Sequence, residues 1–118
     1  MGHGKKVLED LSGQAATLRS LIPDVYAGYS TLSKAVVADG ALDRKTKELI
    51  ALGIAVAVRC DGCIASHARS AARAGATPEE VAEALGVTIM MQGGPSTVYG
   101  PRALDAFLEY YVPPADLG

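Results

Sequence analysis

The chain has 118 residues, which suits a single domain spanning residues 1–118, with one core and no obvious linker. Hydrophobic residues make up 49% of it and aromatic residues only 5%, so we expect closely approaching helices and more apolar surface than a small monomer can hide. The formal net charge is −2 and the basic residues are scattered, which argues against a nucleic-acid partner, whereas oligomerisation would cover the surplus apolar surface.

The N-terminal third of the chain predicts two helices. From about Lys5 to Leu21, apolar residues recur at helical intervals with charged residues between them, which indicates an amphipathic helix. His3, just before it, is expected to lie in a frayed terminus and to have no role. Pro23 suits the first turn of a second helix, from about Asp24 to Ala38, which Asp39-Gly40 stops.

A third helix follows, and its second half is apolar all round. Asp43 can cap its start, and the helix is expected to run to about Val58. The run from Leu49 to Val58 is about half the roughly 20 residues that cross a bilayer, so it predicts a buried helix and not a membrane span. Its β-branched residues would also suit a core strand, but its length and charged lead-in favour a helix.

Start and stop signals in the second half predict further helices. One opens with the cysteine pair Cys60 and Cys63 and ends at Gly75, which supplies a left-handed stop. Thr77-Pro78-Glu79-Glu80 has the capping-box pattern with proline at the first helical position, so it begins the next helix. Gly93-Gly94-Pro95 then breaks that helix.

The last predicted helix runs from about Pro101 to Tyr111, and the tail from Pro113 to Gly118 is expected to be loose or draped over a neighbour. No alternation of period two bounded by hairpin turns is visible. The sequence therefore predicts an all-α, single-domain bundle of about six helices. Because no βαβ pattern surrounds the cysteines, a thioredoxin fold is not expected.

The only two cysteines, Cys60 and Cys63, stand three residues apart, and His67 follows one helical turn later. Positions i and i+4 share a helix face, so His67 would project back over Cys63. The positive end of the helix dipole would favour thiolate over thiol at this place. The pattern predicts a redox site in which Cys63, the thiol nearest to His67, is the nucleophile.

Other interpretations of the cysteine pair stay open on the sequence pattern. Free cysteines are often small buried apolar residues. A structural zinc site would need four ligands, and the only other histidine is His3. A structural disulfide would suit a secreted protein, but nothing resembles a secretory signal. A reducing, cytoplasmic setting fits better, and there a Cys-x-x-Cys pair is more often catalytic, redox-sensing or metal-binding.

Glu48 is the acidic residue nearest to the apolar run, and it could orient or protonate His67. A straight helix places Cys60 roughly 18 Å along the axis from Glu48, so contact requires the next helix to fold back or another subunit to contribute. The pattern alone slightly favours a surface pair between Arg44 and Glu48.

From about Leu42 to Leu108 the chain resembles the superfamily of alkyl hydroperoxidase D and carboxymuconolactone decarboxylase. The residues that carry the resemblance are Lys47-Glu48-Leu49-Ile50-Ala51-Leu52, Cys60-x-x-Cys63-x-x-x-His67, Gly75-Ala76-Thr77-Pro78-Glu79-Glu80-Val81 and Gly93-Gly94-Pro95. The resemblance implies an all-helical fold in trimers or hexamers, and a site built from the glutamate, both cysteines and the histidine. It thereby favours a functional Glu48 over the surface pair.

The resemblance also implies a role for each site residue. Cys63 would attack the peroxide as a thiolate, Cys60 would be the resolving thiol that closes a disulfide, and His67 with Glu48 would relay protons. Hydroperoxidases of this type carry an additional histidine between the cysteines, where this chain has Gly62. That departure bears on the substrate, the reductant and the rate.

These observations lead to one main hypothesis and two alternatives. The main hypothesis is a cytoplasmic thiol peroxidase, or a related disulfide oxidoreductase, that reduces a small peroxide without a bound cofactor or metal and is reset by an external thiol or dithiol reductant, such as a dihydrolipoyl or thioredoxin-type protein. One alternative is a decarboxylase or lactone-processing enzyme, although that chemistry needs no redox thiols. The other is a non-catalytic redox sensor whose thiols control its oligomeric state.

Overall fold

The computed structural model describes residues 2–114 and shows an all-α fold, as the sequence predicted. Within these residues there is no β-strand. The six helices are α1 (His3–Leu21), α2 (Pro23–Val37), α3 (Arg44–Ala57), α4 (Asp61–Arg73), α5 (Pro78–Gln92) and α6 (Gly94–Leu108).

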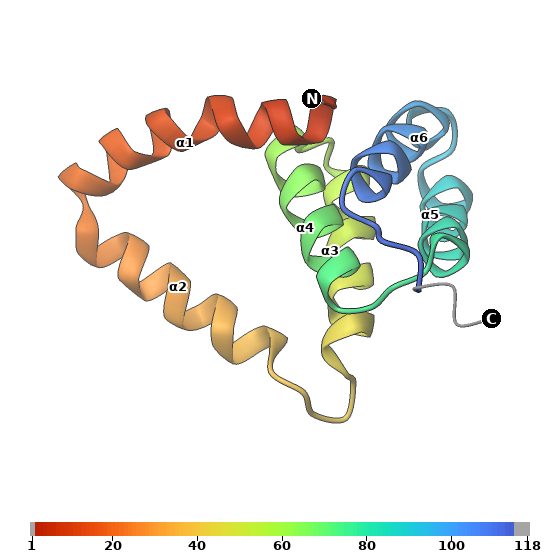
Figure 1. Cartoon of the computed structure of the whole chain (residues 1–118), viewed down its shortest axis with the longest axis horizontal. Coiled ribbons are helices and arrows are strands. Elements are labelled where there is room, and N and C mark those ends of the chain that lie inside the picture. The colour runs from red at the N-terminus through yellow and green to blue at the C-terminus, as the bar shows by residue number, and fades with distance from the viewer. Residues whose placement is uncertain (1, 115–118) are drawn as a thin grey trace.

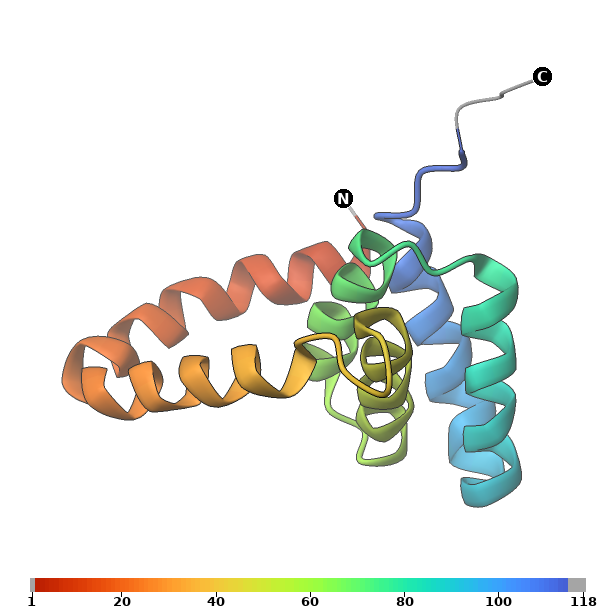
Figure 2. The same ribbon diagram turned by 90° about the horizontal axis from the view of Figure 1, so that it is seen from below.

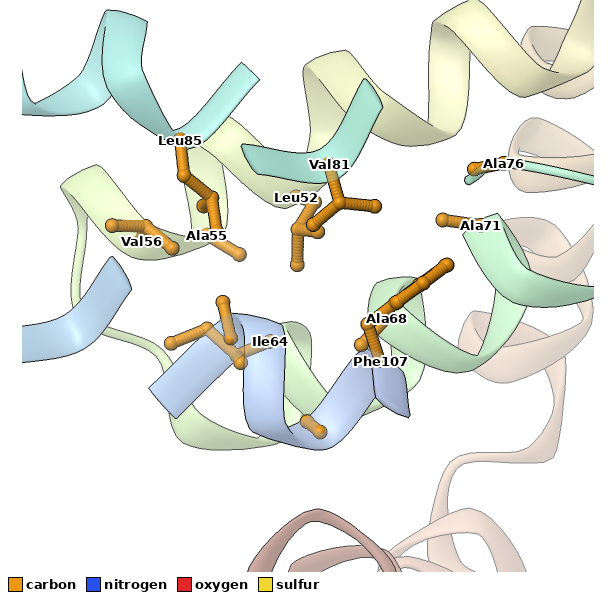
Figure 3. Close-up of a cluster of buried hydrophobic side chains, with 12 residues drawn as sticks. Leu52, Ala55, Val56, Ile64, Ala68, Ala71, Ala76, Val81, Leu85 and Phe107 are labelled. Atoms are coloured by element: carbon orange, nitrogen blue, oxygen red, sulfur yellow. The ribbon is translucent and has the colours of Figure 1, made fainter. Parts of the chain in front are cut away.

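Helices α3 to α6 form a bundle around a shared apolar core (Figure 1). Side chains from all four helices meet in it, among them Leu52 from α3, Ile64 from α4, Val81 from α5 and Phe107 from α6 (Figure 3). Burying a side chain of this size stabilises the fold by about 1.5–3 kcal/mol. The other core members are largely alanines, which let the helices approach closely, as the composition predicted: Ala55, Ala68, Ala71, Ala76, Ala103 and Ala106.

Helices α1 and α2 form an arm, residues 3–37, that extends away from the bundle in both views (Figures 1 and 2). No residue of α2 is buried, and Gly4 is the one buried residue of α1. Apolar side chains on α2 stay largely in contact with solvent, with Val25 62%, Tyr29 67% and Leu32 59% exposed. The surplus of apolar surface expected from the composition therefore lies partly on the arm. It also lies on the outside of the bundle, where Ile54 is 59% and Met91 73% exposed.

The start of α1 is fixed against the end of α6. Glu109, directly after α6, accepts hydrogen bonds from the backbone N–H of Gly4 at 2.8 Å and of Lys5 at 3.1 Å. A carboxylate at this place satisfies two otherwise unpaired N–H groups and faces the positive end of the helix dipole. The expectation of a frayed terminus around His3 is wrong, because α1 already begins there.

Most of the predicted helix caps are confirmed. Asp43 caps α3 by accepting from the N–H of Thr46 at 2.8 Å, which holds the pKa of the Asp43 carboxyl below its ordinary value. Thr77 and Glu80 form the reciprocal bonds of a capping box at the start of α5. Gly75 takes a φ of 91° after α4, the left-handed stop that the sequence indicated.

The predicted bounds of the last helix are wrong. Gly93 does break the chain, with a φ of 71°, but Pro95 then stands in the first turn of a new helix that starts at Gly94. Pro101 was expected to begin this helix and instead lies inside it, where it cannot donate to the carbonyl four residues earlier. Burial of Ala103, Ala106 and Phe107 on the following turns offsets that lost bond.

The end of the chain is described only in part. Helix α6 ends at Leu108, short of the predicted Tyr111, and residues 113 and 114 lie outside any helix. The expectation that the tail is loose or draped over a neighbour falls mainly on residues 115–118, which are outside the described residues.

Candidate active site

A tight reversal between α3 and α4 positions the cysteines. Arg59 adopts a φ of 57°, and its N–H donates to the carbonyl of Val56 at 3.2 Å while the N–H of Cys60 donates to that of Ala55 at 3.1 Å. These two bonds and the left-handed residue are a Schellman motif, normally built on glycine. A side chain in this conformation costs about 1–2 kcal/mol. The reversal makes α4 fold back along α3.

The two cysteines form a disulfide at the start of α4. Their Cα atoms are 5.2 Å apart, and the Sγ of Cys60, the N-cap residue, accepts a hydrogen bond from the N–H of Cys63 at 3.2 Å. Cys63 is exposed, whereas Cys60 is half-buried. Both sulfurs lie at the N-terminal end of a helix, where its dipole favours a thiolate. The structure therefore holds the oxidised form of a pair placed for thiol chemistry.

One helical turn after Cys63, His67 of α4 meets Glu48 of α3. The Nδ1 atom of His67 lies 2.9 Å from the Oε1 atom of Glu48. The Glu48 side chain is 2% exposed and that of His67 is 33% exposed. Because a buried carboxylate needs a partner, this contact accounts for a glutamate in the interior. The predicted surface pair between Arg44 and Glu48 is wrong, since Glu48 faces inward.

The contact also orients the imidazole. When the Nδ1–H donates to the Glu48 carboxylate, Nε2 is left with a lone pair and can accept a proton. His67 and Cys63 are four residues apart on α4 and so share a helix face, as predicted. No hydrogen bond joins the His67 ring to either sulfur in the described structure, where both sulfurs are held in the disulfide.

Two neighbours of the cysteine turn lie outside the sequence motif. Arg102 of α6 pairs with Asp61, the first residue of α4, at 3.1 Å between Nη1 and Oδ1. Leu11 of α1 covers Gly62, since a Cβ atom built on that glycine would lie 3.4 Å from the Cδ2 atom of Leu11. Both contacts join segments far apart in the chain, so local sequence patterns gave no signal for either. Side-chain space at Gly62 is thus limited by α1.

Two hollows of the described structure differ in their relation to the cysteines. An apolar groove of about 400 Å³ runs between α3 and α5, lined by residues such as Ile50, Ile54 and Val87, and neither cysteine lines it. A second hollow, of about 760 Å³, lies between the arm and α4 and is lined by Leu11 and Ser66 among others. Leu11 covers the cysteine turn and Ser66 adjoins His67, so the second hollow is the one next to the site.

Two further findings concern metal binding and membrane insertion. Within residues 2–114 no group of three or more His, Cys, Asp or Glu side chains is placed to hold a metal ion. No helix in that part of the chain is both long and apolar enough to span a bilayer.

The fold and the site together define a class of protein. It is an all-α bundle in which a Cys-x-x-Cys pair opens one helix, and a histidine one turn later contacts a glutamate of the preceding helix. The profile of the carboxymuconolactone decarboxylase family matches residues 23–106, from the start of α2 through most of α6. The chain belongs to this family.

Solved structures agree with this assignment. The apo structure of a carboxymuconolactone decarboxylase family protein from Legionella pneumophila is 43% identical, with a TM-score of 0.87, and the match covers 92% of this chain and 97% of that one. A family member from Thermotoga maritima, for which a part in the antioxidative response has been suggested, is 32% identical with a TM-score of 0.67 over 80% of this chain and 86% of its own.

An uncharacterised protein from Cupriavidus necator is 37% identical over 103 residues, which are 87% of this chain and 91% of that protein.

Proposed function

We propose that the chain is a thiol-dependent peroxidase, or a closely related disulfide oxidoreductase, that serves in antioxidant defence. The observation that carries the proposal is the disulfide between Cys60 and Cys63 at the exposed start of α4, next to the buried contact of Glu48 with His67. The suggestion made for the Thermotoga relative, whose structure is similar, points in the same direction.

The proposed cycle begins with the reduced pair. His67, oriented by Glu48, accepts the proton of the Cys63 thiol, and the thiolate attacks one oxygen of a small peroxide. The O–O bond breaks, a sulfenic acid forms on Cys63, and the leaving oxygen takes up the proton and departs as an alcohol, or as water from hydrogen peroxide. The Cys60 thiol then displaces water from the sulfenic acid and closes the disulfide.

An external dithiol completes the cycle by returning two electrons and two protons to the disulfide. A dihydrolipoyl or thioredoxin-type protein would suit this step, and the cycle needs no bound cofactor. A reducing, cytoplasmic compartment would keep such a reductant available.

The assignment of Cys63 as the attacking thiol is supported by two observations. Cys63 is the more exposed of the two residues, and it shares a helix face with His67. One observation favours the opposite order, because the N–H of Cys63 bonds to the Cys60 sulfur and would stabilise a thiolate there. Substitution of each cysteine separates the two orders.

The test is peroxide consumption in the presence of a dithiol reductant, measured for the wild type, Cys63→Ser and Cys60→Ser. We expect Cys63→Ser to be inactive, and Cys60→Ser to complete one turnover and accumulate a sulfenic acid that a dimedone-type reagent traps. A sulfenic acid on Cys60 in the Cys63→Ser variant would reverse the roles. Equal turnover by wild type and Cys63→Ser would refute the proposal.

We also propose that the chain forms a homo-oligomer, with a trimer or hexamer as the expected state. The support is the apolar surface of the arm, where Val25, Tyr29 and Leu32 are each more than half exposed. Light scattering over a range of concentrations tests this, and a monomer at micromolar concentration would contradict it.

A redox sensor is the second candidate, because Leu11 connects the arm to the cysteine turn at Gly62. In a sensor, reduction would change the oligomeric state while peroxide turnover stayed low. Mass measurements of the reduced and oxidised forms distinguish the two functions. The decarboxylase activity in the family's name has less support, because redox thiols have no part in that chemistry.

A further inference from the structure

Arg102 reaches the cysteine turn from a different helix and has no part in the proposed cycle. Its Nη1 atom lies 3.1 Å from the Oδ1 atom of Asp61, and its guanidinium lies 4.7 Å from the centre of the Tyr99 ring. Tyr99 and Arg102 are three residues apart on α6, so they share a face of that helix. The stacked ring and the carboxylate together fix the position of the guanidinium.

Asp61 occupies a place that suits the helix but opposes the thiol chemistry. It is the first residue of α4 and stands between the two cysteines in the sequence. A carboxylate in a first helical turn interacts favourably with the helix dipole. The same negative charge disfavours a thiolate nearby, because like charges repel. An unpaired Asp61 would therefore reduce the fraction of reactive thiolate.

One other cation adjoins the cysteine turn. From the α3–α4 connection, Arg59 precedes Cys60 and makes no ion pair in the described structure, so its charge acts alongside Arg102 in favour of a thiolate. From the bundle interior, Glu48 and His67 pair with each other. From α1, the neighbour of the turn is the apolar Leu11.

We propose that Arg102 is a positioning residue for the thiol chemistry, which holds the Asp61 carboxylate in an ion pair and so preserves the thiolate of the Cys63 site. The inference rests on the proposed function, since it assigns Arg102 to the same thiol reaction. Arg102 acts through Asp61 and does not touch the reacting atoms. It follows that Arg102 matters when Asp61 is charged and matters much less when Asp61 is replaced.

The experiment is a double-mutant cycle on thiol reactivity. The protein carries Cys60→Ser, so that Cys63 is the single thiol. The rate of its alkylation by iodoacetamide is measured from about pH 5 to about pH 10, in steps of about half a pH unit. The variants are Arg102→Gln, Asp61→Asn and both together. Arg102→Lys is the conservative variant, and circular dichroism verifies the fold of each.

We expect Arg102→Gln to move the midpoint of the pH profile upward and to slow alkylation at neutral pH by about two- to fivefold, the range typical of exposed ion pairs. Asp61→Asn should move the midpoint downward. In the Asp61→Asn protein, adding Arg102→Gln should have less than about half of its effect in the parent. Arg102→Lys should recover part of the parental rate, because it keeps the charge.

A matched control removes a positive charge at the C-terminal end of α4, the helix that begins with Asp61. Arg73 is exposed and stands twelve residues beyond Asp61, roughly 18 Å along the α4 axis and outside the Debye length of about 8–10 Å. Arg73→Gln should leave the profile unchanged.

Three results would overturn the inference: an unchanged midpoint in Arg102→Gln, the same shift in both backgrounds, or an equal shift in Arg73→Gln. Alkylation requires no peroxide, so the inference can fail while the peroxidase proposal holds. If the protein consumes no peroxide but shows the coupled shift of the alkylation midpoint, the peroxidase proposal fails and the role of Arg102 holds.

Discussion

The bundle and the arm have similar apolar content, but the bundle has a buried apolar core and α2 has none. In the bundle, Leu52 and Phe107 are completely buried, whereas Leu32 on the arm is 59% exposed and Tyr29 is 67% exposed. The bundle also holds the buried contact of Glu48 with His67, and α2 buries no residue. The core and the proposed proton relay thus belong to the bundle, while the arm presents apolar side chains to solvent.

The strongest test of this difference compares two leucines. Leu52→Ala should lower the free energy of unfolding by about 2–5 kcal/mol, because it leaves a cavity in the core. Leu32→Ala should change it by no more than about 0.5 kcal/mol, since its side chain is already exposed. Urea unfolding at low protein concentration measures both.

Repeating the leucine comparison at high concentration extends it to assembly. If the arm is covered in an oligomer, the cost of Leu32→Ala should grow with concentration. Similar costs for the two variants at low concentration would contradict the division into core and arm.

A second test compares two glutamates. Glu48→Gln should reduce peroxide turnover by about 100-fold or more, because it removes the carboxylate that orients His67 while keeping the shape of the side chain. Glu9→Gln, on the exposed surface of α1, should leave turnover unchanged. Steady-state kinetics with a dithiol reductant provide the measurement, and an undiminished Glu48→Gln enzyme would remove the relay from the mechanism.

The third test concerns the contact between arm and bundle, with two glycines of α1. A Cβ atom on Gly4 would lie 2.8 Å from both the Cβ atom of Ala106 and the Oε1 atom of Glu109, so Gly4→Ala should cost about 1–3 kcal/mol. Gly13 has no atom within 4 Å of such a Cβ, so Gly13→Ala should stabilise α1 by about 0.5–1 kcal/mol. Thermal unfolding should show a lower Tm for Gly4→Ala and a higher Tm for Gly13→Ala. An unchanged Tm for Gly4→Ala would show that the start of α1 is held more loosely against α6.

The smallest expected effect concerns the cap of α5. There the capping carboxylate, Glu80, is three residues from Thr77, whereas the carboxylate at the start of α1, Glu109, comes from the far end of the chain. The hydrogen bond from Lys45, at 2.8 Å, and then the bond from Thr77 hold the pKa of Glu80 below its ordinary value of 4.5. Folding therefore favours the ionised form, which stabilises the protein fully above pH 4.5, and this contribution is lost as the pH falls through the lower folded pKa.

Glu80→Gln should accordingly lower the Tm by only about 2–4 °C at neutral pH, because the pair is partly exposed and screened. The difference from wild type should disappear in acid below the folded pKa. A difference that persists there would assign the effect to packing and not to charge.

Local signals in the sequence predicted the helices and failed where distant segments meet. The caps at Asp43, Gly75 and Thr77 were all identifiable because each depends on neighbours within a few residues. The start of α6 was misplaced because Pro95 and Pro101 are equally good first-turn residues locally, and tertiary burial decides between them.

The candidate site shows the same limit. The i, i+4 spacing predicted that Cys63 and His67 share a face, but a straight helix places Glu48 roughly 18 Å along the axis from Cys60. The left-handed conformation of Arg59, a residue type that rarely adopts it, produces the reversal that brings His67 of α4 back to Glu48 of α3. Arg102 and Leu11 could not be predicted, because they reach the cysteine turn only through the packing of α6 and α1.

The bond from Glu109 to the first turn of α1 brings the beginning of the first helix and the end of the last into contact. Adjacent ends of this kind suit circular permutation. A permuted protein could join these two ends by a short linker and begin in the connection between α2 and α3. The arm would then become a C-terminal appendage, removable by a stop codon while the four bundle helices keep their native order.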